Sequence, residues 1–168
     1  EIYLVNVKGG EIDGRRVYRS LADLPEVPDL AVVMTPAETI PRLILELGER
    51  GTRVAVVISA GPGNGADGAK VNARWRRHIL RAARPHLLRV VGPNTIGYAM
   101  PRLGLNASFG PGNLKAGRVA AVAQSGAVLA GLADWGAAQG IGFSHLISMG
   151  DMSDVDFGDV LDMLARDS

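Results

Sequence analysis

Residues 30–58, LAVVMTPAETIPRLILELGERGTRVAVVI, decide the fold class of this chain. Two short runs, at 30–34 and 54–58, are continuously apolar and rich in Val, which is typical of strands buried on both faces of a parallel sheet. Between them, apolar side chains recur at the i, i+3, i+4, i+7 spacing of an amphipathic helix, at Ile40, Leu43, Ile44 and Leu47. The stretch therefore predicts a strand, a helix and a second strand joined by a right-handed crossover.

The start of this first helix carries recognisable signals. Thr35 is able to cap it, Pro36 suits the first helical position and Glu38 completes a capping box. We therefore expect the helix to begin at Pro36.

The same alternation continues on both sides. Further short apolar runs predict strands at 2–5, 87–91, 119–122 and 146–148. A helix is predicted around 71–79, where Val71, Trp75 and Ile79 form a narrow apolar stripe with Arg74, Arg77 and Arg81 largely turned away. Another is predicted at 157–164. The whole pattern indicates an α/β fold with a parallel sheet.

One long stretch interrupts this pattern. Residues 92–117 have no strong period and are rich in Pro and Gly, and they are too long for an ordinary loop between a strand and a helix. We place a domain boundary here, giving a first domain at 1–116 and the start of a second at 117–168. The chain also opens directly on a strand and stops after two strands and two helices of the second domain. We therefore expect both ends to be cut.

Composition excludes several classes of protein. The 168 residues are 47% hydrophobic and 21% charged, with a formal net charge of +1, which argues against an obligate nucleic-acid binder. The chain has no cysteine, so disulfides and thiolate chemistry are excluded. No apolar run reaches the roughly 20 residues needed to cross a bilayer, and we expect no leader sequence. We predict a cytoplasmic location and no metal site.

Candidate binding residues follow the predicted strands, because parallel sheets bind ligands beyond the carboxyl ends of their strands. The residues there are small, polar or glycine-rich, so that a ligand is able to lie against the backbone. Lys8 is the only cation among them and is a candidate phosphate contact. A set of ordinary turns is the alternative. The turn residues are 6–10, 35–38, 59–62, 92–95 and 123–126.

Two motifs suggest other chemistry. The segment 63–68 matches G-x-G-x-x-G, but the acidic residue that dinucleotide sites need about 20 positions later is absent, so a flexible loop is favoured over a nicotinamide site. Ser125 stands at a strand-to-helix turn whose free N–H groups suit an oxyanion or phosphate, or it is a plain N-cap. Because His145 lies too early for the usual order of a catalytic triad, a serine hydrolase is disfavoured. His145 is expected to be structural.

The ordered series of these segments resembles the NDP-forming acyl-CoA synthetases, the superfamily that includes the succinyl-CoA synthetase α subunit. The resemblance covers nearly the whole chain. The matching stretches are KGGEIDG at 8–14, VISAG at 57–61, GPNTIG at 92–97, LNASF at 105–109, VAQSGA at 122–127, SMGD at 148–151 and DVDF at 154–157. The chain has Val7 where the family has proline and Thr95 where it has cysteine.

The resemblance implies a Rossmann-like CoA-binding domain that lacks its first strand, followed by the beginning of a flavodoxin-like domain. It implies that coenzyme A is the substrate, and that ATP or ADP and Mg²⁺ bind only in the parent protein. Gln124, Ser125 and Gly126 would receive the phosphate of a phosphohistidine loop at a helix N-terminus. The residues implied to line the CoA site are Lys8, Thr35, Pro36, Ser59, Ala60, Gly61, Asn94 and Thr95.

The resemblance further implies partners and limits. The remaining ligase and nucleotide-grasp domains would lie in the same chain or in another subunit. The expected ligand is CoA or acyl-CoA, no nucleic acid or membrane is expected as a partner, and the protein is expected to be an oligomer. None of His78, His86 and His145 matches the phosphohistidine, so this chain alone is not expected to catalyse the ligation. A regulatory CoA-sensing module of a protein lysine acetyltransferase and a nicotinamide-binding Rossmann domain stay open as alternatives.

Overall fold

The computed structural model describes residues 1–110, 112 and 114–167, and its strands form three sheets. The strands are β1 (Leu4–Val5), β2 (Gly10–Ile12), β3 (Arg15–Tyr18), β4 (Leu30–Val33), β5 (Val54–Val57), β6 (Arg89–Val91), β7 (Gly97–Met100), β8 (Leu105–Ser108), β9 (Ala116–Ala123) and β10 (Phe143–Ser148). The helices are α1 (Ile40–Arg50), α2 (Gly68–Ala83), α3 (Gly126–Ala138) and α4 (Phe157–Arg166). Short 3₁₀ turns are η1 (Leu21–Asp23), η2 (Ala37–Thr39), η3 (Arg84–His86) and η4 (Pro101–Leu103).

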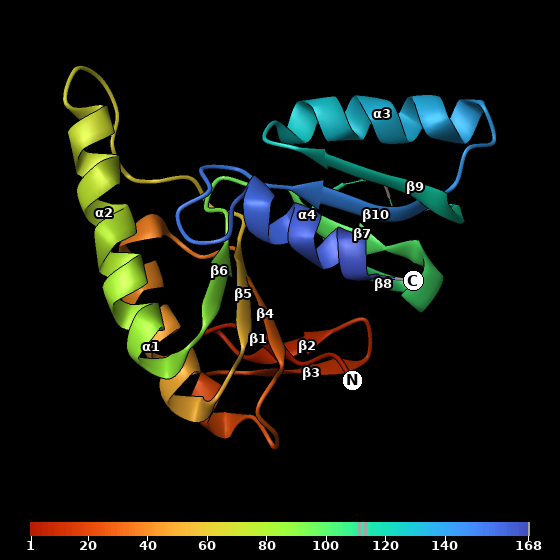
Figure 1. Cartoon of the computed structure of the whole chain (residues 1–168). Coiled ribbons are helices and arrows are strands. Elements are labelled where there is room, and N and C mark those ends of the chain that lie inside the picture. The colour runs from red at the N-terminus through yellow and green to blue at the C-terminus, as the bar shows by residue number, and fades with distance from the viewer. Residues whose placement is uncertain (111, 113, 168) are drawn as a thin grey trace.

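The first sheet is parallel, in the order β4-β5-β6. Helices α1 and α2 lie side by side against one of its faces (Figure 1). Ile44 from α1, Ile79 from α2 and Val57 and Val90 from the strands are all fully buried in this layer. Burial of one such side chain stabilises the fold by about 1.5–3 kcal/mol. The predicted strand, helix and strand of residues 30–58 are therefore confirmed.

The predicted start of α1 is wrong. Residues 37–39 form the 3₁₀ turn η2, and α1 begins only at Ile40. The reason is a second proline, Pro41, which lies in the first turn of α1. A helix that began at Pro36 would place Pro41 in its interior, where proline removes a hydrogen bond and clashes with the preceding turn. The Thr35 hydroxyl instead accepts a hydrogen bond from Thr39 Oγ1 at 2.8 Å.

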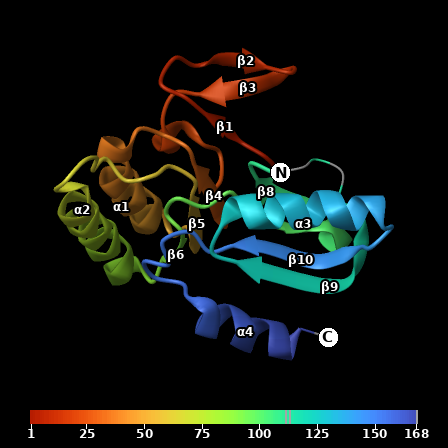
Figure 2. The ribbon, with the colours of Figure 1, turned by 90° about the horizontal axis from the view of Figure 1, so that it is seen from above.

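The second sheet has the order β8-β7-β10-β9 and is mixed. β9 and β10 are parallel, whereas β7 runs antiparallel to β10 and to β8. Leu146 packs in the cluster beneath α3, and its neighbour Ile147 packs in the cluster beneath α4. Since successive residues of a strand point to opposite faces, α3 and α4 cover opposite faces of this sheet, as Figure 2 also shows.

The β7–β8 hairpin lies in the stretch 92–117, where the sequence has no strong period and a domain boundary was predicted. Its strands pair from Gly97 with Ser108 to Met100 with Leu105, and β7 pairs with β10. The hairpin therefore belongs to the same sheet as the strands that follow residue 116. The domain boundary between 116 and 117 stays a prediction.

The third sheet, β1-β3-β2, stands apart from the first. The prediction that β1 is a buried strand of the main parallel sheet is wrong, because β1 pairs with β3. In Figure 1 the strands of this third sheet run across the direction of β4–β6. Ile2 is 66% and Val5 41% exposed, so this apolar run is not buried on both faces. No described helix combines the length and the apolarity that crossing a membrane requires.

Candidate functional site

Three predicted binding residues meet at the carboxyl edge of the first sheet. Ser59, the second residue after β5, donates a hydrogen bond from Oγ to the carbonyl oxygen of Thr35, the second residue after β4, at 2.7 Å. The Ser59 carbonyl accepts a hydrogen bond from the backbone N–H of Asn94, after β6, at 3.1 Å. The ends of all three strands are thus joined into one edge, which we call the β4–β6 edge and define by Thr35, Ser59 and Asn94.

The backbone around this edge is only lightly covered. Pro36 and Ala60 are exposed, and Gly61 is half-buried. A Cβ atom at Gly61 would lie 2.4 Å from Asn72 Oδ1, so the glycine is needed for the approach of α2. Small residues here leave room for a ligand to lie against the peptide groups of the strand ends.

Asn94 and Thr95 are neighbours in sequence with different surroundings. Asn94 is exposed, has a positive φ of 58°, and donates from Nδ2 to Asp151 Oδ1 at 3.3 Å. Thr95 is only 3% exposed, and its hydroxyl donates to the Ser148 carbonyl at 2.6 Å and accepts from the Gly97 N–H at 2.9 Å. The Asn94 side chain is therefore accessible to a ligand, whereas the Thr95 hydroxyl is occupied inside the protein.

Lys8 lies in the turn between β1 and β2, where it is exposed. Its backbone N–H donates to Asn6 Oδ1 at 3.0 Å, which fixes the turn. Because β1 is outside the first sheet, the carboxyl end of β1 is not part of the β4–β6 edge. Among the described residues, no hydrogen bond or ion pair joins Lys8 to that edge.

The second candidate position is the N-terminus of α3. Ser125 is the N-cap residue in extended conformation, its side chain makes no capping hydrogen bond, and both Gln124 and Ser125 are exposed. The first turn of α3 contains no acidic residue. Free N–H groups and the helix dipole favour an anion at such an end. A Cβ at Gly126 would lie 2.3 Å from Ile96 Cγ2, so the glycine lets the segment after Asn94 approach this helix closely.

The loop between β10 and α4, residues 149–156, connects the two positions. The Gly150 N–H donates to the Gln124 carbonyl at 3.2 Å, and the Asp151 N–H donates to the Pro93 carbonyl at 2.8 Å. Gly150 has a φ of 57°, and a Cβ there would lie 2.2 Å from the Pro93 oxygen. This connecting loop therefore holds the α3 N-terminus beside the β4–β6 edge.

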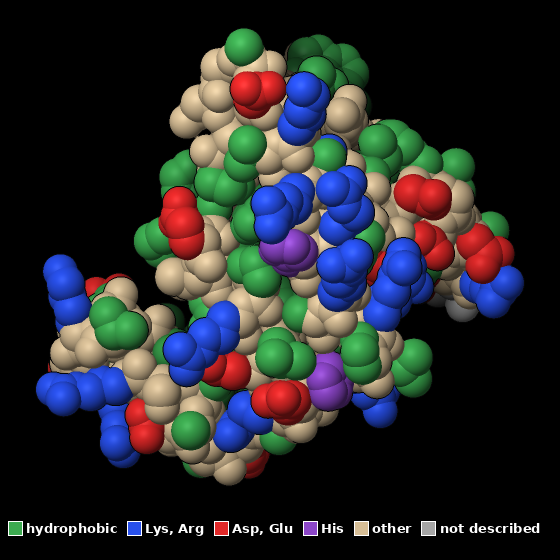
Figure 3. Space-filling model, turned by 90° about the vertical axis from the view of Figure 1, so that its left-hand side faces the viewer, with side chains coloured by type: hydrophobic (Ala, Val, Ile, Leu, Met, Phe, Trp, Pro, Cys, Tyr) green, Lys and Arg blue, Asp and Glu red, His purple; other side chains and the backbone are tan. Residues whose placement is uncertain are grey.

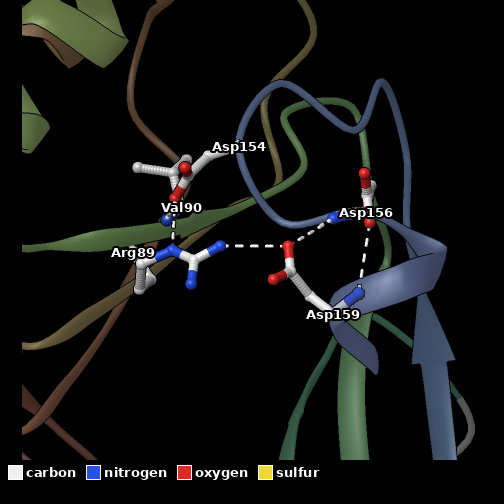
Figure 4. A network of polar contacts seen from close by, with 5 residues as sticks. All are labelled: Arg89, Val90, Asp154, Asp156 and Asp159. Carbon is white, nitrogen blue, oxygen red and sulfur yellow. Dashed lines mark hydrogen bonds and ion pairs between the residues drawn. The ribbon is translucent and has the colours of Figure 1, made fainter. Parts of the chain in front are cut away.

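A network of ion pairs fixes the other end of the connecting loop (Figure 4). Arg89 of β6 donates from Nε to Asp154 Oδ2 at 2.9 Å and from Nη2 to Asp159 Oδ2 at 3.0 Å. The Val90 N–H also donates to Asp154 Oδ2, at 2.9 Å. The hydrogen bond that Arg89 donates to Asp154 is the main reason that the pKa of Arg89 is raised. Asp156 and Asp159 form a capping box at the start of α4.

Sequence reasoning missed the roles of two residues of this loop. It assigned no contact to Asp151 or Asp154, yet both are used as long-range partners. Asp151 Oδ2 pairs with Arg76 Nη1 of α2 at 3.0 Å, besides accepting from Asn94. Nothing in the local sequence indicates these contacts, because the residues that make them are 57 to 75 positions apart.

The remaining motifs have structural roles. Residues 63–67 form a loop that leads into α2 at Gly68. The Gly63 N–H donates to Asn72 Oδ1 at 2.7 Å, and a Cβ at Gly63 would lie 2.3 Å from the Gly68 oxygen. The predicted flexibility of this loop stays a prediction. His145 is buried in β10, with Nδ1 3.2 Å from Ser144 Oγ and Nε2 3.8 Å from Asp167 Oδ2.

A parallel sheet whose carboxyl edge carries small and polar residues, beside a free helix N-terminus, defines the class of Rossmann-like ligand-binding α/β proteins. Residues 1–101 match the family model of the CoA binding domain, and residues 116–168 match that of the succinyl-CoA ligase like flavodoxin domain. The chain belongs to the NDP-forming acyl-CoA synthetase superfamily.

Curated relatives agree with this assignment. The chain is 37% identical to the acetate–CoA ligase [ADP-forming] I subunit alpha of Pyrococcus furiosus, over 99% of this chain and 36% of that protein. It is 36% identical to acetate–CoA ligase [ADP-forming] I of Archaeoglobus fulgidus, over 99% of this chain and 24% of that protein. The chain thus spans about a third or less of the length of these relatives.

Solved structures have the same fold. PH0766 from Pyrococcus horikoshii OT3 superposes with a TM-score of 0.90 at 35% identity, over 99% of this chain and 37% of that one. The dinucleotide forming acetyl-coenzyme A synthetase 1 of Ca. Korarchaeum cryptofilum, in complex with phosphate and ADP, gives a TM-score of 0.88 at 33% identity. The match covers 98% of this chain and 34% of that one.

Proposed function

We propose that this chain is the CoA-binding part of an NDP-forming acyl-CoA synthetase, which converts an acid, CoA and a nucleoside triphosphate into acyl-CoA, nucleoside diphosphate and phosphate. The observation that carries the proposal is the β4–β6 edge within the segment that matches the CoA binding domain. The parent reaction passes through an acyl phosphate and a phosphohistidine, with nucleotide and Mg²⁺ bound by parts of the parent other than this chain.

The edge suits the chemistry of CoA. The ligand is long and polar, with phosphates, amides and an adenine ring, so it needs backbone groups and neutral side chains along an open edge. Thr35, Ser59 and Asn94 supply these groups, and Ala60 and Gly61 leave the backbone uncovered. Asn94 is held by Asp151, so its amide is oriented before a ligand arrives.

The α3 N-terminus would serve a different ligand. We propose that Gln124, Ser125 and Gly126 receive the phosphoryl group that travels on the phosphohistidine loop of the parent protein. Backbone N–H groups at a helix N-terminus stabilise negative charge where it develops during phosphoryl transfer. Because the connecting loop fixes this helix end beside the β4–β6 edge, a phosphoryl group there would lie close to the bound CoA.

The test is a calorimetric titration of the chain with CoA, with NAD as the control ligand. We expect CoA and not NAD to bind. Asn94→Ala should weaken CoA binding about five- to tenfold, the loss of one hydrogen bond to the ligand. Gln139→Ala is the matched control, because Gln139 lies exposed at the far end of α3 and should leave binding unchanged. Tighter binding of NAD than of CoA would refute the proposal.

Lys8→Ala is titrated separately. If Lys8 contacts a CoA phosphate, the variant should bind CoA more weakly and with a smaller dependence on salt. Unchanged binding would remove Lys8 from the site and leave the role of the β4–β6 edge intact.

A further inference from the structure

The outer face of α2, together with the residue that follows the helix, carries a straight row of cations. They repeat at spacings of four, three, four and three residues, and every one is exposed. We call this row the basic stripe, and its members are Lys70, Arg74, Arg77, Arg81 and Arg84. Trp75 and Ile79 are buried on the opposite side of the helix, which fixes the direction of the stripe away from the protein. Figure 3 looks onto this side of the molecule, where Lys and Arg side chains gather near the middle.

The stripe has almost no counter-charge. Within the described part of the chain, the side chains of Arg74, Arg77, Arg81 and Arg84 have neither an ion pair nor a hydrogen bond. Lys70 alone has a carboxylate nearby, Asp67 at 3.5 Å, and both side chains are at least 80% exposed. The contrast is Arg76, which points to the side of the helix and pairs with Asp151. The sequence has no Asp or Glu from Gly68 to His86.

Helix stability does not account for this arrangement. Like charges three or four positions apart on a helix repel one another and destabilise it. The helix dipole favours cations only in the last turn, near Arg81 and Arg84. Arg74 and Arg77 lie in the first two thirds of α2 and gain nothing from the dipole. A partner that brings negative charge to the stripe would remove the repulsion along its whole length.

We propose that the basic stripe is a docking surface for an acidic helix of a partner protein. Four of its five cations are arginine, whose planar guanidinium binds carboxylates in a bidentate manner and is enriched in protein interfaces. The stripe spans 15 residues, whose 14 steps correspond to roughly 21 Å along the helix axis. A partner helix with Asp or Glu at the same alternating spacing of four and three presents its carboxylates along one line of equal pitch.

A protein partner is favoured over a nucleic acid by the charge of the rest of the chain. The net charge is only +1, so the positive potential is confined to the stripe and does not extend over the molecule. The helix α1, which packs beside α2, has two Glu and two Arg and therefore adds no net charge next to the stripe. The site is also separate from the β4–β6 edge, and the inference does not rest on the proposed binding of CoA.

The test uses synthetic helical peptides as probes, measured by fluorescence anisotropy at low ionic strength, where surface charge pairs are weakly screened. One peptide carries Glu at the 4-3-4-3 spacing, and the other has the same composition with the Glu positions scrambled over all faces. We expect the patterned peptide to bind at least about tenfold tighter than the scrambled one. Equal binding of the two peptides, or no binding of the patterned one, would overturn the proposal.

Two variants locate the contact. Arg77→Glu with Arg81→Glu should weaken binding of the patterned peptide by about tenfold or more, since attraction is replaced by repulsion at the centre of the stripe. The control, Arg15→Glu with Arg118→Glu, makes the same change in net charge at exposed positions outside α2 and should change binding by less than about twofold. An equal loss of peptide affinity in both double variants would show that the peptide is attracted only by net charge. That result would refute a specific docking surface. Tighter binding of a duplex DNA oligonucleotide than of the patterned peptide would also refute it.

Discussion

At the scale of single residues, the type of a residue and its position in the sequence say little about whether its side chain is available to a ligand. Asn94 and Thr95 were both predicted to line the CoA site, yet one is exposed and the other is buried with its hydroxyl occupied. Positions after parallel strands are predictable from chain order, because the strand ends share one edge. The direction of each side chain depends on partners such as Ser148, which lies 53 positions away from Thr95.

Gly126 combines a proposed role with a structural one at this scale. Its place at the start of α3 suits a phosphate, and its missing side chain makes room for Ile96. The close atom is a branch methyl of a half-buried isoleucine, so it has little freedom to move aside.

Gly126→Ala should therefore lower the free energy of unfolding by about 1–3 kcal/mol, the usual cost of overpacking. The matched control is Gly131→Ala in the same helix, where a Cβ meets nothing within 4 Å. That change should raise the free energy of unfolding by about 0.5–1 kcal/mol, because alanine loses less backbone entropy than glycine in a helix. Urea denaturation of both variants measures the difference. A stable Gly126→Ala protein would show that Ile96 yields easily.

At the scale of elements, the strands and helices of the two main layers were predictable because long-range burial imposes strong patterns on them. The runs at 54–58 and 146–148 and the helices at 40–47 and 157–164 each appear in the structure. The β2–β3 and β7–β8 hairpins were not predicted. Their strands are short, carry Gly, Asn or charged residues, and in β2–β3 are mostly exposed, so no continuous apolar run marks them. Their pairing depends on the turn and on the neighbouring strand.

The junction between β6 and α4 gives a prediction at the same scale. Asp154 accepts from both Arg89 and the buried Val90 N–H, so its removal leaves a backbone donor without its partner. Asp154→Ala should lower the free energy of unfolding by about 1–3 kcal/mol. Asp154→Asn keeps an acceptor oxygen, so its free energy of unfolding should lie between that of Asp154→Ala and that of the native protein.

The control for this junction is Asp162→Ala. Asp162 forms an exposed pair with Arg166 one turn away on α4. Such pairs contribute less than about 0.5 kcal/mol, so urea denaturation should barely distinguish this variant from the native protein. A similar decrease in the free energy of unfolding for Asp154→Ala and Asp162→Ala would mean that the Arg89 network stabilises the fold no more than a surface ion pair does.

At the scale of the whole molecule, the two main sheets are held together by the connecting loop 149–156. Its backbone bonds to Pro93 and Gln124, and its side chains pair with Arg76 and Arg89. The sequence predicted two domains, but not that one loop would bond to strand ends in both. That information is spread over residues that meet only in the folded chain.

This connection predicts that the two sheets unfold together. The chain has two tryptophans, so in a Trp135→Phe variant the fluorescence of buried Trp75 reports on the first sheet alone. Hydrogen exchange followed by mass spectrometry reports on β9 and β10 in the same protein. We expect both probes to give the same urea midpoint, as in a two-state transition. Loss of protection in β9 and β10 before the change in Trp75 fluorescence would show that the sheets are independent.

The β7–β8 hairpin has a practical consequence for the expression of separate fragments of this chain. The segments that match the two family models end at residue 101 and resume at residue 116, and a truncation made in that interval would leave β7 with one piece and β10 with the other. β10 would then expose a row of unpaired peptide groups along an apolar strand, and such an edge promotes aggregation in the expression host. An expression clone intended to give soluble protein from the second half should therefore begin before Gly97.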